Sequence, residues 1–145
     1  MTRYSELHDK GLIEPGRFSS EQVEDLLKVA QRDLATSGEI LESAHEWAYA
    51  IAYNAMLQAG RAFMFEKGYR SRGEGHHLTV IKFLRAGLDP KFASTISVMD
   101  RMRRKRNRSM YDTVGAISLK EAGEAVETAR DFVEEVCRML KYTSD

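Results

Sequence analysis

The sequence predicts an all-α fold, an up-and-down bundle of four to five helices. Apolar residues recur at steps of three and four along several long segments, which is the spacing of one helix face. Only 2 prolines occur among 145 residues, so few positions interrupt a helix. This length suits one domain with one hydrophobic core. We expect an N-terminal arm over residues 1–18, the bundle over 19–141 and a tail over 142–145.

The first helix of the bundle is expected to begin after Ser19. Gln22 stands three residues later, so the two residues fit a capping box. Ser37-Gly38 is expected to end this helix, because glycine suits a left-handed C-cap. The arm before it shows no sustained apolar period and is expected to hold at most a short helix.

The second helix is expected to run from about Glu42 to Lys67 and to end at Gly68. Residues 47–57 are apolar nearly all round, which is typical of a helix buried at the centre of a bundle. A basic loop with three glycines follows over residues 68–75. It lacks a Gly-Lys-Ser or Gly-Lys-Thr ending and follows a helix, so it does not fit a phosphate-binding P-loop.

His76 and His77 open a short third helix that is expected to end at Leu84 or Arg85. Adjacent side chains point about 100° apart on a helix, so this pair is a poor metal chelate. His45 has no His or Cys partner one helical turn away. We therefore expect no metal site and no cofactor.

The fourth helix is expected from Pro90 to about Arg108, with Asp89 as its N-cap. Its apolar stripe leads on to positions 103 and 106, which places Arg103 and Arg106 on the core-facing side. A solvated run of charge needs no residue on that side. The stripe is therefore expected to leave the core and enter a cleft or meet another subunit. Its apolar members are Phe92, Ile96 and Met99.

A fifth helix is expected to begin after Ser118, with Glu121 at capping-box spacing. Its apolar residues alternate steps of three and four over three heptads, which indicates a packing seam. The lone cysteine, Cys137, lies among apolar residues and is expected to be a buried structural residue. The seam consists of Leu119, Ala122, Val126, Ala129, Val133, Val136 and Leu140.

Charge is distributed unevenly along a chain whose formal net charge is zero. Residues 1–60 carry five Lys or Arg against ten Asp or Glu, residues 61–108 carry thirteen against four, and residues 109–145 carry four against eight. A basic middle between acidic ends predicts a positive surface for a polyanion. The alternative is that the acidic helices neutralise the basic one within the fold or across a dimer. Both interpretations remain open on sequence alone.

The chain carries no signal of export or membrane insertion. No apolar run approaches the roughly 20 residues of a membrane span, and the N-terminus lacks a signal-peptide pattern. A single cysteine also fits a reducing compartment. The expected location is therefore the cytoplasm.

Several segments together resemble the HEPN domain family, named for higher eukaryotes and prokaryotes nucleotide-binding. They are the Tyr53-Asn54-Ala55-Met56 and Gly60-Arg61-Ala62 runs of the second helix, the glycine-bounded loop, His77, and Arg106-Asn107 followed by Tyr111. The resemblance covers roughly residues 19–141. It implies a helical bundle that usually dimerises, and many members are metal-independent ribonucleases. Their motif is an Arg, often followed by Asn, with a His four to six residues later.

The resemblance implies that Arg106 is the motif arginine and Asn107 the polar residue after it, while Tyr111 stands where the His is expected. A phenol with a pKa of about 10 is a poor base at neutral pH, and loss of the His would lower the cleavage rate by on the order of 10²–10⁴. A second register uses Arg104 with Ser109 in the His place. There Tyr111 matches a tyrosine that a nucleotidyltransferase antitoxin modifies in some members.

Positions 106 and 111 lie about 140° apart around a continuous helix. Either the helix bends near Ser109, or Arg106 of one subunit faces Tyr111 of the other in a dimer.

Three functions follow from the resemblance. The first is a homodimer that binds RNA or a nucleotide in a basic interfacial cleft, as part of a toxin–antitoxin system with a minimal nucleotidyltransferase. The others are a metal-independent, toxin-like endoribonuclease and a non-catalytic helical docking subunit.

In the first two functions the centre of the site would be Arg106, Asn107 and Tyr111. The remaining basic residues of the segment would contact phosphates, because arginine and lysine carry most contacts to a nucleic-acid backbone. These are Arg101, Arg103, Arg104, Lys105 and Arg108.

Overall fold

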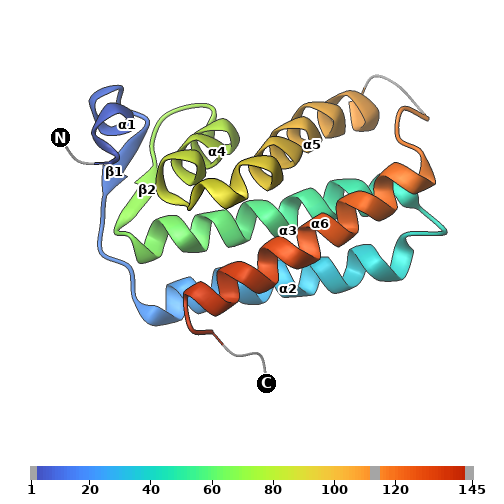
Figure 1. Ribbon diagram of the computed structural model, residues 1–145, viewed down its shortest axis with the longest axis horizontal. Helices are drawn as coiled ribbons and strands as arrows, with labels where there is room; N and C mark the ends of the chain where they lie inside the picture. Colours follow the sequence, from blue (N-terminus) through green and yellow to red (C-terminus); the bar gives the residue numbers. More distant parts are fainter. Residues whose placement is uncertain (1–2, 112–114, 143–145) are drawn as a thin grey trace.

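The computed structural model describes residues 3–111 and 115–142, with the backbone alone over 107–111. Within these residues the protein is the all-α bundle that the sequence predicts, with a small two-stranded sheet at one end (Figure 1). The elements in chain order are α1 (Ser5–Asp9), β1 (Ile13–Pro15), α2 (Ser20–Ile40), α3 (His45–Glu66), β2 (Tyr69–Ser71), α4 (His76–Gly87), the 3₁₀ turn η1 (Pro90–Phe92), α5 (Ala93–Tyr111) and α6 (Leu119–Met139).

Helix α3 lies at the centre of the bundle, as its nearly continuous apolar sequence predicts. It packs against α2, α4, α5, α6 and β2, and Figure 1 shows α2, α3, α5 and α6 along the long axis of the molecule. Small residues line much of its surface, so neighbouring backbones approach closely. The buried ones are Ala48, Ala50, Ala52, Ala55, Ala59, Gly60 and Ala62.

Gly60 sets the distance between α3 and α4. A Cβ atom at this position would lie 2.8 Å from Cγ1 of Val80 and 3.1 Å from Cδ1 of Leu84. Both side chains are buried. This close approach fixes α4 against the middle of α3, and it thereby places His77, in the first turn of α4, beside α3.

The N-terminal arm is more ordered than a single short helix. Besides α1 it contributes β1, which pairs antiparallel with β2 so that Ile13 lies opposite Ser71. Leu7 and Ile13 are buried, and the ring of Tyr4 stacks on Phe83 with 4.1 Å between centroids. The glycine loop after α3 therefore contains a strand. Two strands of three residues give too short a pattern for sequence periodicity to reveal.

The predicted helix ends are mostly confirmed. Ser19 accepts a hydrogen bond from the backbone N–H of Gln22, whose side chain accepts one from the backbone of Ser19, which is the full capping box. Ser118 likewise accepts from the N–H of Glu121. The predicted end of the first helix at Ser37-Gly38 is wrong, because α2 continues to Ile40. The Ser37 hydroxyl donates to the carbonyl of Leu34 inside the helix.

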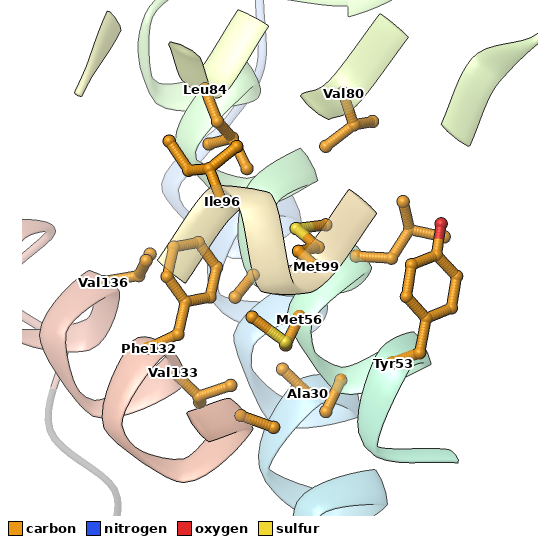
Figure 2. Close-up of a cluster of buried hydrophobic side chains, with 14 of the residues drawn as sticks. Ala30, Tyr53, Met56, Val80, Leu84, Ile96, Met99, Phe132, Val133 and Val136 are labelled. Atoms are coloured by element: carbon orange, nitrogen blue, oxygen red, sulfur yellow. The ribbon is translucent and has the colours of Figure 1, made fainter. Parts of the chain in front are cut away.

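The core is shared by α2, α3, α4, α5 and α6, and Figure 2 shows buried side chains from all five helices. Met56 and Met99 are fully buried there, and the seam predicted on α6 is buried except at its two ends, Leu119 and Leu140. Cys137 is a free, buried thiol whose pKa is raised by burial. In the parts of the chain that are described, no helix is both long and apolar enough to cross a membrane.

Candidate functional site

The basic residues of α5 differ in how much of each side chain is exposed to solvent. Met102 is buried and continues the apolar stripe one turn beyond Met99. Arg103 and Arg106 flank this stripe and are partly buried, whereas Arg101 and Arg104 are exposed. The predicted continuation of the stripe to positions 103 and 106 is therefore wrong by one residue, because the stripe continues through Met102, and Arg103 and Arg106 lie at its borders.

Arg103 is fixed by an acidic neighbour on its own helix. Its Nε and Nη2 atoms donate to Oδ1 of Asp100 at 3.2 and 3.0 Å. Nη2 of Arg104 lies 3.6 Å from the other oxygen of the same carboxylate. About a quarter of the Arg103 side chain is exposed, against 62% for Arg104. The Asp100 carboxylate thus orients Arg103 without covering it completely.

Lys105 points to a different helix. Its Nζ atom donates to both carboxylate oxygens of Glu121 on α6, at 2.7 and 2.8 Å. At this residue the acidic end of the chain does neutralise the basic middle, as one of the two sequence interpretations holds. Lys105 therefore ties α5 to α6, and the structure does not bring it together with Arg106.

Arg106 lies against the aromatic ring of Tyr53 on α3. Its guanidinium carbon is 5.7 Å from the ring centroid, within the range of a cation–π contact. Tyr53 is buried, and Figure 2 shows it at the side of the core cluster where Val80 of α4 also lies. Burial raises the pKa of the Tyr53 phenol above its ordinary value, although Arg103 and Arg106 act in the opposite direction. The phenol therefore keeps its proton at neutral pH.

His77 completes the site from α4. Its Nδ1 atom lies 3.0 Å from the Tyr53 hydroxyl oxygen. Burial lowers the pKa of His77, and the positive charges of Arg106, Arg103 and His76 lower it further. The imidazole is therefore neutral at pH 7. Since the phenol keeps its proton, it can donate to Nδ1, and this assignment leaves the ring proton on Nε2.

We call Arg103, Arg106, Tyr53 and His77 the Arg-Tyr-His cluster. Its members come from three helices, with two guanidinium groups beside a phenol and a neutral imidazole. This combination can bind a phosphate and can exchange a proton near neutral pH. Sequence reasoning identified the two arginines, but it judged the His76-His77 pair a poor metal chelate and used His77 only as part of the family resemblance, with no role in the site. The hydroxyl group of Tyr53 in the largely apolar sequence of α3 was the feature that could have pointed to the other members of the cluster.

Three of the predicted site residues cannot be placed in this cluster. The side chains of Asn107, Arg108 and Tyr111 lie outside the described residues, as does that of Ser109 from the second register. The backbone of α5 is helical from Ala93 to Tyr111, so Ser109 lies within the helix. Positions 106 and 111 of one chain therefore lie about 140° apart around the helix axis.

The described residues contain no group of three or more His, Cys, Asp or Glu side chains that could hold a metal ion. Within the cluster, Tyr53 and His77 share a hydrogen bond, whereas Arg103 is paired with Asp100, which lies outside the cluster.

The fold is a helical bundle, and α3, α4 and α5 carry the Arg-Tyr-His cluster. The model of the HEPN domain matches residues 23–140, and the chain belongs to the HEPN domain family. No curated protein sequence is significantly similar to it. Membership is consistent with binding of nucleotides or RNA, or with a nuclease-like function.

Proposed function

We propose that this protein binds RNA or a nucleotide through the Arg-Tyr-His cluster, with Arg106 as the principal phosphate contact. The observation that carries the proposal is the position of Arg106, partly buried and in contact with the Tyr53 ring. The positive charge of Arg103 acts to lower the pKa of both Tyr53 and His77. His77 is hydrogen-bonded to the Tyr53 hydroxyl. HEPN domains commonly form dimers and bind nucleotides, which supports the same function.

Pre-organisation is the physical reason to favour Arg106 over the other cations of α5. A side chain that already rests on an aromatic face loses little rotamer freedom when it binds a ligand. A partly desolvated guanidinium also interacts more strongly with a phosphate than a fully hydrated one.

The proposal includes a homodimer. Within one chain, the 140° separation keeps Tyr111 and Arg106 from facing each other. In a dimer, Tyr111 of one subunit could face Arg106 of the other. The family also suggests a minimal nucleotidyltransferase as partner in a toxin–antitoxin pair. Light scattering of the purified protein tests the first point, since the proposal requires twice the mass of the 16.5 kDa chain.

The binding function is tested by the salt dependence of RNA affinity. Arg106→Gln should weaken binding to single-stranded RNA and lower the slope of log K against log salt by about 0.7, the value for one lost phosphate contact. Arg85→Gln, which alters an exposed arginine on α4, is the matched control and should leave both quantities unchanged. An Arg106→Gln protein with the affinity and slope of the parent would refute the proposal.

A metal-independent ribonuclease is the second candidate, and the neutral imidazole of His77 favours it. Attack of an RNA 2′-hydroxyl on the next phosphate needs a proton acceptor, a proton donor and positively charged groups beside the negatively charged phosphorane oxygens. His77 could exchange the proton that Tyr111 exchanges poorly, and Arg103 and Arg106 could supply the charge. Incubation with RNA in EDTA should then give 2′,3′-cyclic phosphate ends, and His77→Gln should abolish them. Intact RNA after incubation with the parent protein would leave binding alone.

A further inference from the structure

A cavity of about 500 Å³ opens beside His77. It lies between α3, α4, β2 and the start of α2, and His77 lines it while also belonging to the Arg-Tyr-His cluster. None of the described side chains that line the cavity is acidic. Two are arginines, Arg61 and Arg70, and two are histidines, His76 and His77. The lining therefore favours an anionic ligand.

Among the cations that line the cavity, Arg61 is held in place by a series of hydrogen bonds. Its Nη1 atom donates to Oε1 of Gln58 at 2.8 Å, Gln58 donates to Asn54 at 3.1 Å, and Asn54 donates to Oδ2 of Asp33 at 2.6 Å. Asp33 is a buried carboxylate on α2. This series of hydrogen bonds fixes the orientation of both amides and holds Arg61 on the cavity wall. Arg70 differs, because it is paired with Glu14 of β1.

An aromatic pair stands next to Arg61. The rings of Phe18 and Phe65 stack with 4.0 Å between centroids and 11° between planes. The guanidinium carbon of Arg61 is 5.6 Å from the Phe65 centroid. Both phenylalanines are only partly buried and line the cavity. One wall therefore offers a flat apolar surface beside a fixed positive charge.

We propose that this cavity binds a nucleoside monophosphate unit, with the base near Phe18 and Phe65 and the phosphate near Arg61. The volume is within the roughly 300–1,000 Å³ range of small-molecule sites, and aromatic stacking beside a cation is how proteins hold single-stranded bases. The inference rests on the proposed function in one respect: the unit would belong to an RNA whose neighbouring phosphate reaches Arg106. His77 lies between the two sites, because it contributes to both.

Calorimetric titration of the full chain with AMP, GMP, CMP and UMP tests the proposal, with inorganic phosphate and the four nucleosides as separate probes. At least one nucleotide should bind about tenfold more tightly than either phosphate or its own nucleoside, since base and phosphate both contribute. Arg61→Gln should weaken that binding by about tenfold or more. Arg85→Gln is the control and should bind as the parent does.

Chemical shifts of the parent protein keep the test independent of any effect of Arg61→Gln on folding. Addition of the nucleotide should shift the methyl signals of Leu57 and Val80, which line the cavity, and leave that of Leu119, exposed on α6, in place. Absence of nucleotide binding, equal affinity for inorganic phosphate, or shifts confined to other regions would overturn the cavity proposal. RNA binding that still depends on Arg106 would show that the proposed function survives such a failure.

Discussion

Arg106 and Lys105 are neighbours in sequence but have different surroundings. Lys105 is paired with a carboxylate of α6, whereas Arg106 contacts an aromatic ring of α3. The apolar stripe of α5 predicted Arg103 and Arg106 on the inward side, whereas the stripe continues through Met102 and the two arginines border it. The sequence could not predict the hydrogen bond between Tyr53 and His77, because that contact joins two helices whose relative position depends on packing at Gly60.

The lowered pKa of His77 predicts how stability depends on pH. The folded protein binds this proton less readily than the unfolded chain, so His77 favours folding above the unfolded pKa of about 6.5 and opposes it progressively as the pH falls from there towards the folded pKa. His77→Gln should therefore lose less stability than the parent between about pH 7 and pH 5. Urea unfolding at both values measures this.

The control for that experiment is Leu119→Ala, which changes an exposed residue of α6 that does not titrate. It should retain the pH dependence of the parent. Equal losses of stability in His77→Gln and the parent would show that burial and the two arginines do not affect this imidazole in solution.

Tyr53→Phe separates the two roles of the Tyr53 side chain. The ring that Arg106 contacts is retained, so RNA affinity should stay within about threefold of the parent. Loss of the hydroxyl that bonds His77 should lower the free energy of unfolding by about 0.5–1.5 kcal/mol. Tyr53→Leu removes the ring as well and should also weaken RNA binding. If Tyr53→Phe weakened RNA binding as much as Tyr53→Leu, the ring contact would not be what positions Arg106.

At the scale of the elements, features with local causes were predictable. The capping box at Ser19, the cap at Ser118, the central helix and the seam of α6 depend on residues within one or two turns of each other. The end of α2 was not predictable from Ser37-Gly38, because glycine permits a left-handed cap without requiring one. The strands β1 and β2 were missed for another reason, since they stabilise each other across more than fifty residues of sequence.

Two glycines within helices provide a test of helix packing. Gly38 lies on α2, where an added Cβ would make ordinary contact at 3.7 Å with Arg130, whereas at Gly60 it would lie 2.8 Å from Val80. Gly38→Ala should stabilise the protein by about 0.5–1 kcal/mol, because alanine favours helix. Gly60→Ala should be less stable than Gly38→Ala by about 1–3 kcal/mol, the usual cost of overpacking. Thermal and urea unfolding would show the difference, and equal stability of the two variants would refute the close contact of α3 and α4.

At the scale of the whole molecule, the uneven charge along the chain has two structural consequences. Part of the basic middle is neutralised within the fold, as Lys105 and Glu121 show. Another part surrounds His77, with Arg103 and Arg106 on one side and the cavity with Arg61 and Arg70 on the other. Internal neutralisation extends to Arg70 and Arg103, which are paired with Glu14 and Asp100, and a surface for a polyanion stays a prediction.

The most direct measurement of phosphate binding at the cluster is an NMR titration of the His77 imidazole with and without single-stranded RNA. A phosphate held by Arg106 would stabilise the protonated ring, so RNA should raise the pKa of His77 from its lowered value. The signal of His8 should not respond, and Arg106→Gln should abolish the change. RNA that binds while the pKa of His77 stays the same would show that its phosphates lie elsewhere on the protein.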